Sequence, residues 1–127
     1  MGTNMSAGSG YLTTHVLDTA RGCPAEGIPV TLYRISEGKQ VEIASAVTNS
    51  DGRTDGPILA KGHFTPGQYL LVFSAGDYLK KHGLVDGKDA FLFLDEIPIR
   101  FGSSDGEAHY HVPLLLSPYG FSTYRGS

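Results

Sequence analysis

Short runs of alternating apolar and polar side chains, separated by turns rich in glycine, proline and aspartate, constrain this sequence more than any other feature. Because successive side chains of a β-strand point to opposite faces, such alternation predicts strands with one buried face. The runs 11–18 (YLTTHVLD) and 109–117 (HYHVPLLLS) show it clearly. Further strands are predicted over 28–35, 40–48, 68–73, 97–101 and 121–125. About seven or eight short strands with frequent turns predict an all-β fold, a sandwich of two sheets.

Only one helix is predicted, over 76–83 (GDYLKKHG), with Asp77 as its N-cap and Gly83 at its C-cap. Pro98 has no N–H to donate, so it predicts an edge strand or a bulge. The 127 residues match the size of one domain. Residues 1–10 (MGTNMSAGSG) are predicted to be a disordered leader, which makes 11–127 the folded domain.

Charge, hydropathy and cysteine usage argue against several classes of protein. Ten basic and thirteen acidic residues leave a formal net charge of −3, and basic residues do not cluster beyond the pair Lys80-Lys81, so we expect no nucleic-acid partner. No apolar run reaches the roughly eighteen residues that a membrane span needs. The start of the sequence has no secretory signal pattern, so we expect a cytoplasmic setting, or a periplasmic one if a signal peptide has been removed. The single Cys23 cannot form an internal disulfide.

Two histidines lie on the predicted outward face of their strands. His15 shares that face with Leu17, and His111 shares it with Pro113 and Leu115. If both strands belong to one sheet, the two imidazoles lie on the same face. Imidazoles are the side chains best suited to move protons near neutral pH, so the pair is a candidate acid-base centre.

The positions of the other three histidines give weaker evidence of a functional role. His109 points to the same face but stands next to a loop, where we expect a solvated neighbour, and His63 and His82 are expected to be structural or exposed. A zinc site built from His15, His109 and His111 is an alternative, because neutral imidazoles bind zinc. The spacing matches no established zinc pattern, so we predict no metal and no cofactor.

A tight turn and the end of the sequence add further candidates. Arg53 follows the turn signal Asp51-Gly52, and its guanidinium could hold a planar or anionic ligand at two points. Tyr124 continues the alternation of the last strand, which argues against a frayed tail. The serines lack the strand-to-helix elbow of a nucleophilic hydrolase, so a serine nucleophile is the weaker hypothesis.

Three blocks of sequence together resemble a known family. They are THVLDTARGCPAEGIPVTLYR (14–34), TNSDGR (48–53) and HYHVPLLLSPYGFSTYRGS (109–127), which ends in Tyr-Arg-Gly-Ser. In this order they are similar to the transthyretin-like 5-hydroxyisourate hydrolases of urate degradation, and the resemblance runs from about Leu12 to Ser127. One departure is Asp95, which stands where relatives often carry proline before Glu96.

The resemblance implies a fold, an assembly and an activity. The fold is a transthyretin-like sandwich of eight strands with one short helix, and the assembly is a homotetramer, a dimer of dimers with a channel between the pairs. The activity is hydrolysis of the small molecule 5-hydroxyisourate to 2-oxo-4-hydroxy-4-carboxy-5-ureidoimidazoline. The implied catalytic set is His15, Arg53 and His111. The implied substrate-binding residues are Ser122, Thr123, Tyr124, Arg125, Gly126 and Ser127, with Ser122 and Thr123 in supporting roles.

Two other functions are weighed against this one. A non-catalytic carrier could hold a flat aromatic ligand in the same channel, and a purely structural sandwich could belong to a larger assembly. Transthyretin, the hormone carrier with this fold, lacks both the catalytic histidines and the terminal tetrapeptide. Their presence here favours an enzyme.

Overall fold

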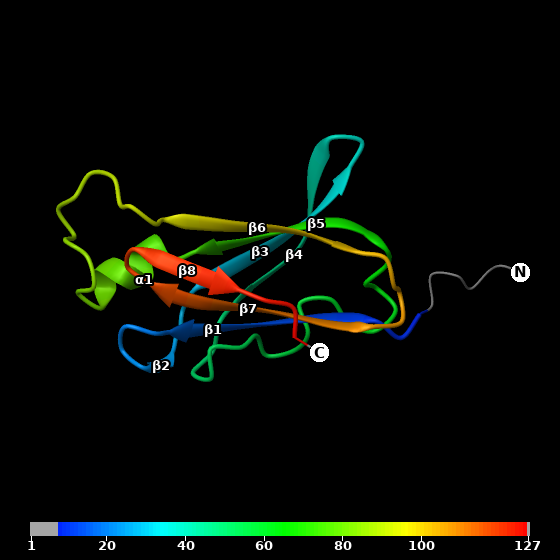
Figure 1. Cartoon of the computed structure of the whole chain (residues 1–127), viewed down its shortest axis with the longest axis horizontal. Coiled ribbons are helices and arrows are strands. Elements are labelled where there is room, and N and C mark those ends of the chain that lie inside the picture. Colours follow the sequence, from blue (N-terminus) through cyan, green and yellow to red (C-terminus); the bar gives the residue numbers. More distant parts are fainter. Residues whose placement is uncertain (1–7, 127) are drawn as a thin grey trace, which may run out of the picture.

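Two four-stranded sheets face each other in the computed structural model, which describes residues 8–126 (Figure 1). The strand order is β2-β1-β7-β8 in the first sheet and β4-β3-β5-β6 in the second. In chain order the elements are β1 (Tyr11–Asp18), β2 (Cys23–Pro24), β3 (Pro29–Ser36), β4 (Lys39–Val47), β5 (Gly67–Ser74), α1 (Gly76–Lys81), β6 (Glu96–Ser103), β7 (His109–Ser117) and β8 (Gly120–Thr123). The predicted all-β sandwich with one short helix is confirmed.

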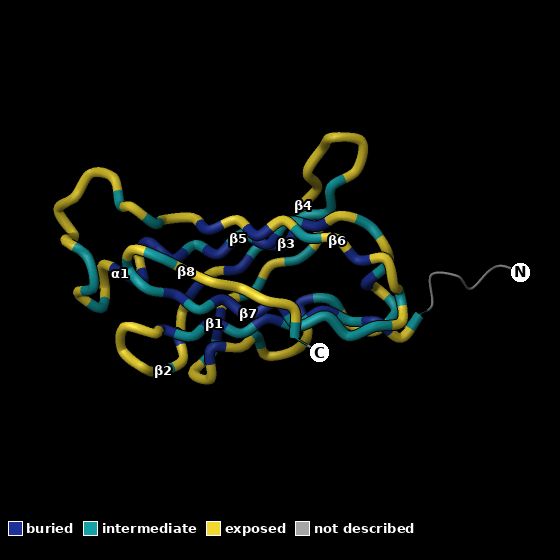
Figure 2. Tube along the Cα trace, viewed as in Figure 1, coloured by how far each residue is buried: buried dark blue, intermediate teal, exposed yellow. Residues whose placement is uncertain are grey.

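The core lies between the sheets and follows the predicted alternation. In β1 every second residue is buried, beginning at Leu12, and the residues between them are half-buried. The inward faces of the other strands contribute Val30, Leu32, Tyr69, Leu71, Phe73, Ile97, Ile99, Val112, Leu114 and Leu116. Full burial of one such side chain stabilises the fold by roughly 1.5–3 kcal/mol. Figure 2 shows the buried segments along the facing strands, while the tip of the β3–β4 hairpin and most of the loop between α1 and β6 are exposed.

The first sheet is built around a parallel pair of strands that lie far apart in the sequence. β1 and β7 run side by side in the same direction (Figure 1), with Tyr11 opposite His109, Thr13 opposite His111 and His15 opposite Pro113. A hairpin cannot produce this arrangement, because parallel strands need a crossover connection. Here the crossover contains the whole second sheet.

The predicted caps of the short helix differ from those in the structure, whereas the predicted edge strand at Pro98 is confirmed. Asp77 is not the N-cap, because the helix begins one residue earlier, and Ala75 caps it without a side-chain hydrogen bond. Asp77 instead lies in the first turn, where its negative charge interacts favourably with the positive end of the helix dipole. Gly83 follows the C-cap residue His82 and has a φ of 68°. Pro98 lies in β6, an edge strand, as predicted.

The predicted disordered leader, 1–10, falls mostly outside the described residues, and its boundary stays a prediction. Within the described part, Gly10 donates its N–H to the carbonyl of Gly106 at 2.9 Å, and Ser9 hydrogen-bonds to Glu107. Among residues 8–126 no helix has the length and apolar character that a membrane span requires.

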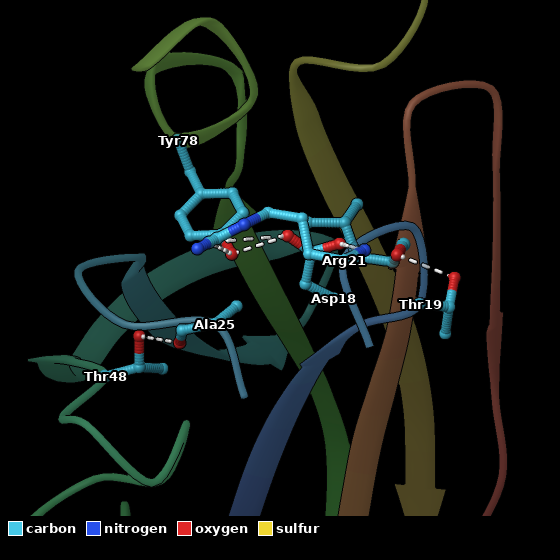
Figure 3. A network of polar contacts seen from close by, with 7 residues as sticks. Asp18, Thr19, Arg21, Ala25, Thr48 and Tyr78 are labelled. Atoms are coloured by element: carbon cyan, nitrogen blue, oxygen red, sulfur yellow. Dashed lines mark hydrogen bonds and ion pairs between the residues drawn. The ribbon is translucent and has the colours of Figure 1, made fainter. Parts of the chain in front are cut away.

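A buried carboxylate joins the helix to the end of β1 (Figure 3). Asp18 is 1% exposed and accepts a hydrogen bond from the Tyr78 hydroxyl at 2.6 Å and one from the Arg21 N–H at 2.9 Å. The Arg21 guanidinium donates to the Tyr78 oxygen at 3.0 Å. A buried charge needs such partners, since leaving it unpaired is costly. Burial, together with the hydrogen bond to Asp18, raises the pKa of Tyr78 to about 12.

Replacement of Tyr78 by phenylalanine is therefore expected to lower the free energy of unfolding by about 1.5–3 kcal/mol at pH 8, the usual contribution of a hydrogen bond to a charged group. Below pH 10 the folded and unfolded states both keep the phenol proton. The difference in free energy of unfolding between wild type and Tyr78→Phe then has its full value. Between pH 10 and about 12 only the unfolded state ionises, so the difference should shrink as pH rises. Urea unfolding at equal protein concentration measures both effects. Tyr119→Phe, at an exposed site, is the control, and a difference that stays constant up to pH 11 would contradict the assignment.

Candidate active site on the first sheet

The outward face of β1 and β7 brings together the histidines on which the sequence analysis concentrated. The rings of His15 and His111 are half-buried, and their centroids lie 6.3 Å apart. Because β1 and β7 are neighbours in one sheet, the expectation that the two imidazoles share a face is met by the geometry. Their catalytic roles stay a prediction.

Arg53 reaches this face from the turn over residues 49–56. The turn is organised by the side-chain oxygen of Asn49, which accepts the N–H groups of Asp51 and Arg53 at 2.9 and 3.2 Å. Gly52 has a φ of 76°, and a side chain there would collide with the Val16 carbonyl, so only glycine fits. The turn then pairs with β1 through Arg53 opposite His15. The conformation of this turn therefore positions Arg53 next to the two histidines.

A backbone carbonyl defines the protonation of His15. The Nε2 atom of His15 lies 2.9 Å from the carbonyl oxygen of Asp51. A carbonyl can only accept, so Nε2 carries the proton, and in the neutral ring Nδ1 keeps its lone pair. His111 is oriented differently, because its Nδ1 lies 2.8 Å from the Thr13 hydroxyl and its Nε2 remains for other partners.

Burial and positive charge both keep these imidazoles neutral. Desolvation is the larger cause that lowers the pKa of His15, and the Arg53 guanidinium lowers it further. The same two causes, in the same order, lower the pKa of His111, with smaller contributions from His15 and His109. At neutral pH both rings therefore hold an unprotonated nitrogen, which is what a general base requires.

His109 belongs to this site, and the prediction that it is a solvated neighbour was wrong. Its ring is half-buried and stacks on Tyr11, with centroids 4.0 Å apart and planes at 4°. Its Nε2 lies 2.7 Å from the same Thr13 hydroxyl that contacts His111. Thr13 was not among the site residues predicted from the sequence. Thr13 lies close to His109 and His111 because β1 and β7 are paired in parallel register. Alternation within a single strand does not reveal that register.

An open depression of about 420 Å³ lies beside these side chains. Its lining residues are Tyr11, Thr13, Thr14, Arg53, Thr54, Gly56, His109 and His111. Among residues 8–126 no group of three His, Cys, Asp or Glu side chains has an arrangement that could hold a metal ion.

The predicted substrate-binding residues of the tail occupy different places. Gly126 pairs with His111 through two backbone hydrogen bonds of 2.6 and 3.3 Å. Thr123 donates its hydroxyl hydrogen to the Pro113 carbonyl, and the Arg125 guanidinium lies 3.9 Å from the centre of the Tyr110 ring. Ser122 lies opposite Leu115, and Tyr124 is 60% exposed. Among the described members of this set, only Gly126 hydrogen-bonds to a catalytic candidate, and Ser127 lies outside the described residues.

Fold and site together define a two-sheet sandwich that carries two half-buried imidazoles and a neighbouring guanidinium on the outer face of one sheet. The chain belongs to the HIUase/Transthyretin family, which it matches over residues 12–126.

Individual relatives agree with this assignment. The chain is 56% identical over 119 residues to the 5-hydroxyisourate hydrolase of Pseudomonas aeruginosa, covering 93% of this chain and 92% of that protein. It resembles the crystal structure of (S)-allantoin synthase with a TM-score of 0.88 and 48% identity, covering 96% of this chain but only 45% of that longer one. It also resembles the 5-hydroxyisourate hydrolase of Klebsiella pneumoniae, with a TM-score of 0.72, 36% identity and coverage of 92% and 99%.

Removal of the Arg53 charge should raise the pKa of both His15 and His111, because a cation beside an imidazole disfavours its protonation. In wild type both rings are expected to titrate below 6.5, and in Arg53→Met both should titrate at higher pH. Histidine ring NMR signals followed against pH measure this. Arg100→Met, on the second sheet, is the matched control. Unchanged titration in Arg53→Met would disprove the electrostatic coupling.

Proposed function

We propose that this chain is an enzyme that hydrolyses 5-hydroxyisourate to 2-oxo-4-hydroxy-4-carboxy-5-ureidoimidazoline in urate degradation. One observation carries the proposal: two imidazoles kept neutral by burial and by Arg53 lie on one face, where His111 and Arg53 line an open depression. The identity of 56% to a protein named 5-hydroxyisourate hydrolase supplies the substrate.

The reaction adds water across a ring amide bond. The water oxygen attacks the carbonyl carbon, the bond from carbon to ring nitrogen breaks, and the nitrogen takes up a proton. One imidazole accepts the proton of the attacking water, through Nδ1 of His15 or Nε2 of His111, the ring nitrogens that their hydrogen bonds leave free. The Arg53 guanidinium opposes the negative charge that develops on the carbonyl oxygen.

The tail residues 122–127 are proposed to close the pocket over the substrate. The support within the described residues is the position of Gly126, whose backbone pairs with that of His111. The side chains of Tyr124 and Arg125 lie elsewhere in the single chain, so their part in binding rests on the resemblance of the terminal sequence.

A homotetramer, a dimer of dimers, is proposed as the working assembly, with the outer faces of the first sheets lining a channel. The half-buried Leu17 and Leu115 on this face support it, because apolar side chains next to a polar site favour a cover. The sites would then lie between subunits. The single hydrolase domain over 11–127 and the cytoplasmic setting stay predictions from the sequence.

Substitution of either catalytic histidine tests the proposal directly. His15→Ala and His111→Ala should each lower kcat/KM by about a hundred- to ten-thousand-fold, the usual contribution of acid-base catalysis. The assay follows the ultraviolet decay of 5-hydroxyisourate, generated in place from urate by urate oxidase. His63→Ala, at an exposed position, is the control. A folded wild-type protein that leaves the spontaneous decay rate unchanged would refute the hydrolase and favour the carrier.

The glycine beside His111 gives a second test. A Cβ atom at Gly126 would lie 3.0–3.4 Å from atoms of the His111 side chain, closer than normal packing allows. Gly126→Ala should therefore displace the ring and lower kcat/KM by up to about a hundredfold, with little change in the free energy of unfolding. Gly87→Ala, where an added Cβ meets open space, is the control. Equal activity in the two variants would exclude a role for this contact.

A further inference from the structure

We propose that Thr13 and His109 form a proton relay behind His111, with Thr13 as the positioning residue that sets which nitrogen of His111 acts as the base. The inference deepens the proposed function and depends on it. It rests on one hydrogen-bonded chain, from His111 Nδ1 through Thr13 Oγ1 to His109 Nε2, with distances of 2.8 and 2.7 Å.

The backbone holds the members of this chain in place. Thr13 on β1 lies directly opposite His111 on β7 in the parallel register, and Tyr11 lies directly opposite His109. All four side chains point to the outer face and are half-buried. Stacking on Tyr11, with the ring planes at 4°, restrains the plane of the His109 ring. Regular strands therefore align the three groups, and no loop has to move to bring them together.

Counting donors shows that the two imidazoles are coupled. A threonine hydroxyl has one hydrogen to donate and two lone pairs to accept. It can therefore donate to only one of the two ring nitrogens that contact it, and the other ring must donate its own N–H to the Thr13 oxygen. When both rings are neutral, the tautomer of His109 thus dictates the tautomer of His111.

One of the two arrangements makes His111 a base. In it, His111 Nδ1–H donates to Thr13, and the Thr13 hydroxyl donates to Nε2 of His109. The Nε2 atom of His111 then holds a lone pair and is available to water. The reverse arrangement puts the proton on Nε2 of His111 and removes the base.

The relay also gives the abstracted proton an exit. When Nε2 of His111 accepts a proton from water, the ring becomes an imidazolium. His111 then passes its Nδ1 proton to the Thr13 oxygen, while the Thr13 hydroxyl passes its own proton to Nε2 of His109. The net result is a neutral His111 that keeps the new Nε2 proton and an imidazolium at His109. The transfer conserves protons: the relay now holds one more proton than at rest, the one taken from water, and that proton's charge resides on His109.

Arg53 favours the movement of positive charge away from His111, whereas the Lys61 ammonium beside Tyr11 opposes its arrival at His109. An imidazolium at His111 has the Arg53 guanidinium as a near neighbour, whereas one at His109 lies against the electron-rich face of Tyr11. The charged and titratable groups around the two ends of the relay are Arg53, His15, Tyr11, Lys61 and Arg125. Of these, Lys61 lies with its Nζ 5.5 Å from the centre of the Tyr11 ring, and Arg125 lies over Tyr110.

Variants of Thr13 test the relay in the 5-hydroxyisourate decay assay. Thr13→Val keeps the shape of the side chain and removes the hydroxyl, so kcat should fall at least about tenfold, as for lost proton-transfer assistance, with KM nearly unchanged. Thr13→Ser restores the hydroxyl and should recover most of kcat. Thr31→Val, on the second sheet, is the matched control. A Thr13→Ser variant as impaired as Thr13→Val, or a Thr13→Val variant with wild-type kcat, would overturn the relay.

The other end of the relay gives an independent measurement. His109→Phe keeps a ring against Tyr11 but has no Nε2, so it should lower kcat as Thr13→Val does. The double variant should be no slower than the slower single variant, because both remove the same chain. Fully additive losses would refute the coupling.

A readout without turnover separates this inference from the proposed function. NMR of histidine ring nitrogens should place the proton of neutral His111 on Nδ1 in wild type, and Thr13→Val should abolish that preference. The proton on Nε2 of His111 in wild type would overturn the relay even in an active hydrolase. An inactive wild-type protein would instead refute the proposed function, and the catalytic relay with it.

Discussion

The parallel pairing of β1 with β7 is the contact on which the site depends. It joins residues almost a hundred positions apart and keeps eight residue pairs in register. Alternate side chains of both strands enter the core, and the side chains between them form the outer face. Burial of Leu12, Val16, Val112 and Leu114 therefore sets the register of the polar residues on the other side. A slip by one residue would place histidines in the core, which makes the register strongly specified.

The outer face of the first sheet brings two histidines and one arginine close enough to change one another's properties. Half-burial and the Arg53 guanidinium together keep His15 and His111 neutral, and hydrogen bonds to Asp51 and Thr13 determine which nitrogens remain free. The guanidinium lowers the pKa of both imidazoles, and in the proposed mechanism it also opposes the developing oxyanion. The pattern suits hydrolysis better than passive binding, because a carrier has no need for imidazoles with a free lone pair.

Stability and chemistry are supplied by different parts of the same strand. The outer face of β1 carries Thr13 and His15, whereas its last residue, Asp18, is buried and ties the strand to α1 through Tyr78. This separation keeps the buried anchor of the strand apart from the residues that face the depression. It also means that the end of the strand near the helix can be anchored without constraining the depression beside Arg53.

Local pattern was enough to predict most of the fold and part of the site. The alternation in β1 predicted which of its residues are buried, and Pro98 predicted an edge strand, because side-chain direction and proline chemistry are local properties. In β7 the alternation holds only in part, because Pro113 on the outer face is buried as well. His15, Arg53 and His111 were likewise recognisable from residue type and from resemblance. Only the tertiary structure decided that β1 and β7 are parallel neighbours, and so that Thr13 joins His109 to His111. A period of two assigns faces within a strand but carries no information about which strand lies beside it or in what register, because core packing across the whole chain selects both.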